Sequence, residues 1–306
     1  MSIIPTRPFK DEVSRVDPAA KLPKDVFLYT LSFLSEEEQK QLFLISKVWN
    51  QYLNIVFEEK LKEIQKKAAP LLLELLTEKI SKYSFKSHKD TYIKITNWAK
   101  NLTEICMCAF YKSERLNTYE ITKSNDVILK ALEIISWIKT NSKEAEKIIR
   151  ISNWENYHVS PKFNKIPNEI ALFSNLQCLT ILSNIKHVSQ RLLQLKNLEY
   201  VSLTATKEEG IHFPEHLLEH WVKLQYLYLW NFSSIAVKEL AHLKNLKSLL
   251  LKNCNIKDFP QEILGLTKIT HLDLTDNCIS EIPTSIFSLN LNTESKKLIG
   301  RGFKNI

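Results

Sequence analysis

The sequence has little glycine and no nucleotide-binding fingerprint. Only 4 of its 306 residues are glycine, and neither GxGxxG nor GxxxxGK[ST] occurs. Phosphate-binding loops use glycine because the backbone must approach the phosphates closely. The common nucleotide-binding loops are therefore excluded, and no cofactor is expected.

The sequence also lacks long hydrophobic runs and paired cysteines. No stretch approaches the roughly 18 consecutive apolar residues of a membrane-spanning helix, and residues 1–17 carry no apolar signal segment. The cysteine count is five, an odd number that does not suggest a disulfide framework. We expect no membrane span and a reducing compartment such as the cytoplasm, with the nucleus left open.

Positive charge is in excess but dispersed. The formal net charge is +8, yet Lys and Arg are spread along the chain, often beside Glu. Residues 60–67 and 296–304 are the denser stretches, which we interpret as a solvated helix face and a basic end. Nucleic-acid binders gather their charge on one surface, so no nucleic-acid partner is expected.

The C-terminal half contains an internal repeat. Five segments align on the template L-x-x-L-x-L-x-x-[N/C], with Asn or Cys at the last position in three of them. Their successive starts are 22, 26, 22 and 23 residues apart. The segments begin at Leu176, Leu198, Leu224, Leu246 and Ile269, and their last positions are Asn184, Thr206, Phe232, Cys254 and Asn277. Each x-L-x-L stretch predicts a short strand whose leucines point into a shared core.

Residues 160–290 thus resemble the leucine-rich-repeat family. The resemblance implies an α/β solenoid with a short parallel sheet, whose strands line a concave wall that binds partners. We expect the repeats and their N-terminal cap over residues 151–290. Residues 291–306 are expected to be a C-terminal cap or tail.

The expected partner-binding residues occupy or flank the non-core positions of these strands. Alternation places them away from the leucines, and Tyr and Trp are favoured residues of protein interfaces. An alternative is that the aromatic side chains pack on one another or on the long 26-residue repeat. The predicted target-binding set is Tyr200, Tyr226, Tyr228, Trp230, Asn231, Leu250, Lys252 and Asp273.

The N-terminal part contains a second motif. Residues 21–53 predict three short helices, with Pro23 in a first turn and Ser35 three residues before Glu38, a capping-box spacing. This segment resembles the F-box, through its Leu-Pro opening and its closing S-x-x-W phrase. The resemblance implies docking on the Skp adaptor, and through it on a cullin. The matching positions are Leu22, Pro23, Val26, Leu31, Leu34, Leu42, Val48 and Trp49. A helical head without a partner is the alternative.

The remaining organisation is mainly α in the N-terminal half. Residues 1–20 are expected to be a flexible N-terminus, residues 21–54 the F-box-like domain, and residues 55–150 a helical linker domain. Apolar residues recur at helical spacing in the linker, and Asn125 or Asp126 is expected to cap its last long helix. We interpret this linker as a spacer.

One catalytic pattern remains. His216, Glu219 and His220 spell HxxEH, a zinc-peptidase phrase, and make a zinc hydrolase a remote alternative. The motif lies between two repeat strands, no distal third ligand is evident, and no cysteine has the neighbours of a catalytic nucleophile. We therefore expect no catalytic residue and no metal.

Together, the two motifs predict a non-enzymatic substrate receptor of an SCF ubiquitin ligase. The head would hold the Skp adaptor and the repeats an unknown target protein. Short chains of this kind resemble effectors that intracellular bacteria such as Legionella inject into host cells. The alternative is a leucine-rich-repeat interaction scaffold without a ligase link.

Overall fold

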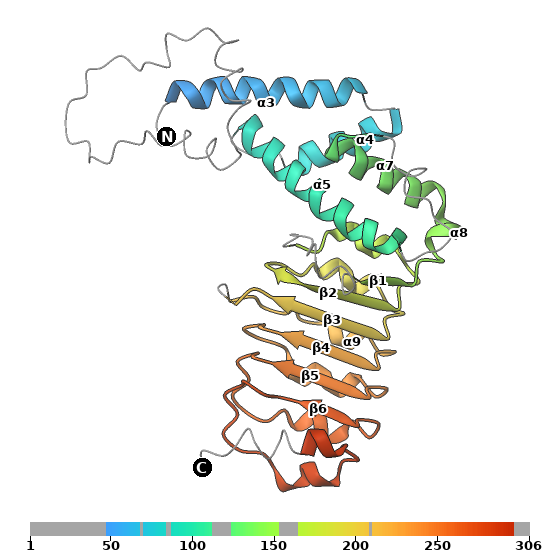
Figure 1. The fold of residues 1–306 in the computed structure, drawn as a ribbon, viewed down its shortest axis with the longest axis vertical. Coiled ribbons are helices and arrows are strands. Elements are labelled where there is room, and N and C mark those ends of the chain that lie inside the picture. The colour runs from blue at the N-terminus through green and yellow to red at the C-terminus, as the bar shows by residue number, and fades with distance from the viewer. Residues whose placement is uncertain are drawn as a thin grey trace, which may run out of the picture. The chain divides into compact units, whose positions relative to one another are not determined.

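The computed structural model describes residues 47–67, 70–83, 87–111, 124–152, 165–207 and 210–296. The chain divides into two compact units, residues 1–68 with 77–94, and residues 69–76 with 95–306. Each unit is described by itself. Figure 1 shows the elements in chain order.

The first unit is helical where it is described. It contains α3 (Lys47–Lys67) and parts of α4 (Pro70–Tyr83) and α5 (His88–Tyr111). The rings of Phe57 and Tyr92 stack with centroids 5.0 Å apart. Exposed ion pairs join Lys62 to Glu58 and Lys67 to Glu63, each at 2.6 Å. This confirms a helix with a solvated charged face at residues 60–67, where exposed pairs add little stability.

The second unit begins with further helices. Its α7 (Val127–Thr140) buries seven apolar residues, and α8 (Ser142–Ala145) follows it. Asp126 caps α7, because its Oδ1 accepts the backbone N–H groups of Ile128 at 2.8 Å and Leu129 at 3.0 Å. The expected helix and cap are confirmed, and residues 95–152 group with the repeat-containing unit.

The repeats form a six-stranded parallel sheet in strict chain order, as Figure 1 shows. Its strands are β1 (Arg150–Ser152), β2 (Cys178–Ile185), β3 (Tyr200–Ala205), β4 (Tyr226–Trp230), β5 (Ser248–Lys252) and β6 (His271–Asp273). Equivalent apolar residues of successive strands stand in register. Leu179 pairs with Val201, and Val201 with Leu227. Leu227 in turn pairs with Leu249, and Leu249 with Leu272. All five are at most 1% exposed, so the repeat leucines form the core.

Short helical segments return the chain between strands. They are η2 (Asn168–Leu172), η3 (Gln190–Gln194), α9 (Leu217–His220), η4 (Val237–His242), η5 (Gln261–Gly265) and η6 (Thr284–Ser288). Pro167, Pro260 and Pro283 precede three of them, where the fixed φ of proline suits the turn into a helix. Each segment buries at least one apolar side chain against the sheet core.

Asparagines close the turns that follow the strands. Asn231, Asn253 and Asn255 adopt positive φ, which asparagine tolerates better than most residues. Asn277 accepts the N–H groups of Cys254 and Ile256 through Oδ1. Its Nδ2 donates to the carbonyl oxygens of Leu251, Leu274 and Thr275. Through these bonds Asn277, at the last position of its repeat segment, connects its own turn to the preceding one.

Two features differ from the sequence-based picture. The N-terminal cap contributes a strand, β1, which pairs with β2 and extends the sheet beyond the five repeats. At the polar repeat position, Phe232 is fully buried and contacts Phe213 with ring centroids 5.5 Å apart. An aromatic contact therefore occupies the position where the template has Asn or Cys.

The structure leaves most of the F-box-like segment outside the described residues. Val48 and Trp49 lie in α3, and the other predicted adaptor-binding residues are outside the described part of the chain: Leu22, Pro23, Val26, Leu31, Leu34 and Leu42. Among the described helices, none has the length and apolarity needed to cross a bilayer.

Candidate binding surface on the sheet

Strand β4 separates the two faces of the sheet. Leu227 and Leu229 are fully buried, while the residues that alternate with them, Tyr226, Tyr228 and Trp230, are half-buried. Alternation therefore places these three aromatic rings on the face opposite the leucine core, as expected. With Tyr200 of β3, which pairs with Tyr226, they define a surface that we name the aromatic face: Tyr200, Tyr226, Tyr228 and Trp230.

The rings of the aromatic face contact one another. Tyr200 lies 5.7 Å from Tyr226 and 5.4 Å from Tyr228, and Tyr228 lies 6.1 Å from Trp230, centroid to centroid. Two of these contacts are edge-to-face, a favourable arrangement for aromatic rings. The rings therefore pack on one another, as the alternative expected, and each stays half-buried. Mutual packing fixes their orientation, so less side-chain entropy is lost when something binds them.

Burial also affects the ionisation of Tyr200, whose ring contacts two others of this face. The pKa of Tyr200 is raised above its ordinary value, chiefly by burial and further by the neighbouring Tyr228 and Cys178, while a hydrogen bond with Ser202 opposes the shift. Tyr200 therefore stays neutral at physiological pH. Its hydroxyl remains a hydrogen-bond donor and acceptor.

Small residues lie beside the rings at outward positions. Cys178 and Ser248 stand in register with Tyr200 and Tyr226 on either side of them, and both are almost fully buried. Ser202, in register with Tyr228, is 1% exposed. Small side chains here leave room for the rings to lie across neighbouring strands.

Polar groups border the aromatic face toward the C-terminal repeats. Lys252 Nζ lies 3.4 Å from Asp276 Oδ2, and Asp273 Oδ1 accepts the backbone N–H of Thr275 at 2.9 Å. Asn231 Nδ2 donates to the carbonyl of Ala205 at 3.1 Å. These contacts pre-orient the charged and amide groups at the edge of the aromatic rings.

The predicted target-binding residues therefore fall into two groups. The aromatic residues and Leu250 present half-buried side chains on one face. The side chains of Asn231 and Asp273 each make a hydrogen bond to the backbone, so they are partly committed to the fold. The side chain of Lys252 forms an ion pair with Asp276, which is itself exposed.

Sequence reasoning missed outward residues at both ends of the sheet. Arg150 pairs with Cys178, in the same cross-strand row as Tyr200 and Tyr226, and His271 pairs with Ser248 in that row. Arg150 was not predicted as an outward residue because β1 is short and precedes the first full repeat. His271 could have been predicted from the repeat alignment, since His271 occupies the position of Tyr226 in its own repeat.

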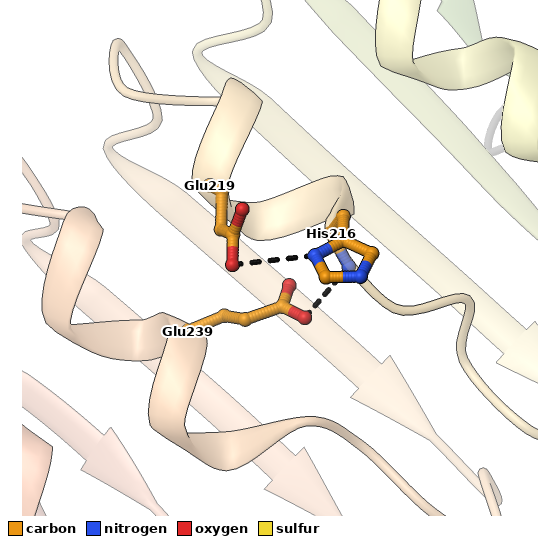
Figure 2. Close-up of side chains that lie close together, drawn as sticks. All are labelled: His216, Glu219 and Glu239. Carbon is orange, nitrogen blue, oxygen red and sulfur yellow. Dashed lines mark hydrogen bonds and ion pairs between the residues drawn. The ribbon is translucent and has the colours of Figure 1, made fainter.

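The HxxEH motif does not form the helical histidine pair of a zinc peptidase. Helix α9 has only four residues, and His216 precedes it with a positive φ of 66°. His220 Nδ1 donates to the carbonyl oxygen of His216 at 2.8 Å. The groups that gather are His216, Glu219 and Glu239, shown in Figure 2. Glu239 comes from the next repeat. Sequence analysis did not group it with His216 because the two residues are far apart in the sequence.

Cys106 and Cys254 are buried thiols. Burial raises the pKa of Cys106 far above its ordinary value, and burial raises that of Cys254 to about 11. Both thiols are therefore protonated near neutrality and unreactive. Cys278 is exposed.

Comparison with known proteins gives a likeness in structure alone. No protein-family model matches the chain, and no curated protein matches its sequence. Three solved structures of leucine-rich-repeat proteins are similar over part of the chain.

The ectodomain of the Arabidopsis thaliana receptor kinase GASSHO1/SCHENGEN3 is 24% identical, with 48% of this chain and 18% of that chain covered and a TM-score of 0.40. An internalin, inlF, from Listeria monocytogenes is 19% identical, with coverage of 57% and 49% and a TM-score of 0.39. The leucine-rich-repeat domain of the type III effector XopL is 18% identical, with coverage of 74% and 78% and a TM-score of 0.40.

These likenesses are loose, and the chain spans less than half the length of the plant ectodomain and of the internalin. Strand register and leucine burial within this chain define its repeats independently. The likeness to these leucine-rich-repeat structures concerns the fold alone.

Proposed function

We propose that this chain is a non-enzymatic interaction protein that recruits a target to a ubiquitin ligase. The aromatic face binds a protein partner, and the F-box-like segment at residues 21–54 binds the Skp adaptor of an SCF complex. The observation that carries the proposal is the half-exposed cluster of four aromatic rings on one face of a sheet whose other face is closed by buried leucines.

The aromatic face has the physical properties of a protein-binding surface. Tyrosine and tryptophan dominate the binding energy of many interfaces, because they bury large area at low entropic cost. Here the rings stand on paired strands and contact one another. Truncating one such anchor typically costs at least about 2 kcal/mol, or roughly 30-fold in Kd.

The adaptor part of the proposal rests on the order of the N-terminal motif. Leu22, Pro23, Val26, Leu31, Leu34 and Leu42 precede Val48 and Trp49 in the spacing that resembles the F-box. The last two lie in the first turn of α3, which begins at Lys47. A chain with this head and an aromatic binding face would work by proximity, raising the effective concentration of a target lysine near the ligase.

This mechanism suits the cytosol, where ubiquitin ligases act. It requires no catalytic residue in the chain. It also suits an effector that a bacterium delivers into a host cell, since such a protein uses the host ligase.

Photo-crosslinking tests the binding face. The photoreactive residue p-benzoylphenylalanine is placed at Tyr228, and in a matched variant at Phe287 of η6, an aromatic residue that is 65% exposed but lies outside the aromatic face. We expect a discrete protein adduct from position 228 that position 287 does not give. The adduct should disappear when Trp230→Ala is added. Identical adduct patterns from both positions would refute the proposed face.

A further inference from the structure

A group of potential metal ligands joins two consecutive return segments. His216 and Glu219 belong to the α9 region, and Glu239 belongs to η4 of the next repeat. His216 Nδ1 lies 3.4 Å from Glu219 Oε1, and one ligand atom from each of the three residues lies within 4.8 Å of the others. Figure 2 shows the three side chains converging from the two segments.

The group has excess negative charge. Glu239 is only 7% exposed, and Glu219 brings a second carboxylate to the same place. Within the described part of the chain, no lysine or arginine forms an ion pair with either carboxylate. A buried carboxylate is costly unless its charge is compensated, and two adjacent carboxylates repel each other.

Backbone hydrogen bonds fix Glu239 and offset part of its charge. Its Oε1 accepts the N–H of His216 at 2.6 Å, and its Oε2 accepts the N–H of Leu218 at 3.2 Å. Each carboxylate oxygen has two lone pairs, so both oxygens retain a free acceptor site. Such hydrogen bonds to a ligating carboxylate are typical of the surroundings of metal sites.

From this geometry we propose that His216, Glu219 and Glu239 form a binding site for one zinc ion. Imidazole nitrogen and carboxylate oxygen are both zinc ligands, and two carboxylates with a neutral imidazole balance the dication. Zinc–ligand bonds of about 2.0–2.2 Å bring donor atoms to roughly 3.4 Å from one another. The side chains of His216 and Glu219 are 63% and 37% exposed, so they can close around an ion held against Glu239.

Zinc at this position would link α9 to η4 and so tie the long repeat to its neighbour. The site differs from the HxxEH arrangement, because Glu239 replaces His220 as the third ligand and no catalytic role is assigned. It is independent of partner binding on the aromatic face, since the ligands come from the return segments.

The test is a titration of the purified full chain with zinc by isothermal calorimetry, in a Cys278→Ser background that removes the exposed thiol. Two variants remove one ligand each: His216→Asn and Glu219→Gln. Asparagine suits the positive φ of His216, a conformation that this chain assigns to asparagine at three other positions. Circular dichroism in chelator verifies that each variant is folded, and Glu219→Gln decides the outcome if His216→Asn does not fold.

A matched control distinguishes the site from a surface histidine pair. His220→Gln removes the second histidine of the motif, while a glutamine amide can still donate to the carbonyl of His216. We expect one zinc per chain with micromolar or tighter affinity. Each ligand variant should weaken binding by roughly tenfold or more, and His220→Gln should leave it unchanged.

Three results would overturn the proposal. They are no saturable binding by the folded chain, equal binding by the ligand variants, or a loss in His220→Gln as large as that in His216→Asn. The last result would assign the zinc to the two histidines four residues apart.

Discussion

Replacing Asn277 by alanine is expected to destabilise the C-terminal repeats by roughly 2–4 kcal/mol. Its Oδ1 accepts the N–H groups of Cys254 at 2.9 Å and Ile256 at 3.1 Å, and its Nδ2 donates to three backbone carbonyl oxygens. Alanine leaves the two N–H groups without this partner, and each buried unpaired group costs about 1–3 kcal/mol. Asn277 is half-buried, so water replaces some of these bonds and the sum is reduced.

The assay is urea and thermal unfolding followed by circular dichroism, with hydrogen exchange measured on peptides spanning residues 246–280. A loss of this size lowers Tm by about 4–16 °C for a unit of roughly 200 residues, and exchange should accelerate first around residues 254–256. Asn277→Asp keeps the acceptor but loses the donors, so its effect should be intermediate. Asn175→Ala, at an exposed position, is the matched control and should stay within about 0.5 kcal/mol of wild type. An equally small effect of Asn277→Ala would refute the reasoning.

Three further predictions concern single side chains. Leu251→Ala should cost about 2–5 kcal/mol in urea unfolding because Leu251 is fully buried, whereas Leu250→Ala on the opposite face should cost less than about 1 kcal/mol; equal losses would contradict the face assignment. The pKa of Cys254 is raised from 9.0 to about 11, so its protonated form is favoured by folding. Its stabilising contribution is complete below pH 9 and is lost as pH rises to 11; wild type should lose about 2 kcal/mol more than Cys254→Ala over that window, and parallel unfolding curves would argue against it. Maleimide should modify Cys278 rapidly in the folded protein and the buried Cys254 only on unfolding; rapid labelling of Cys254 in the folded protein would contradict the burial pattern.

Much of the sheet could be predicted because its signal is local and repeated. Leucines at alternate positions and a fixed period near 22 residues indicate strands that share one core, and the register of Leu227 with Leu249 confirms it. The outward placement of Tyr228 followed from the same alternation. The helix cap at Asp126 was also predictable, since capping depends on residues next to one another.

Features that depend on contacts between repeats were not predictable. Strand β1 is recruited by pairing with β2, and its three residues carry no repeat pattern. Phe232 replaces a polar repeat residue because the long repeat supplies Phe213 as an aromatic neighbour. Glu239 reaches His216 across 23 residues, and only stacking of the return segments brings them together. The residues expected to bind the adaptor lie mostly outside the described part of the chain, so that prediction stands on the motif.

Binding of the purified full chain to the Skp adaptor tests the central claim most directly. Calorimetry is run on wild type, on Leu22→Ala/Pro23→Ala, and on Tyr228→Ala/Trp230→Ala as a matched double variant on the aromatic face. The account predicts micromolar or tighter binding that is lost in the first variant and retained in the second. No binding by a well-folded wild-type chain would contradict the ligase link and leave an interaction scaffold whose aromatic face acts without ubiquitin.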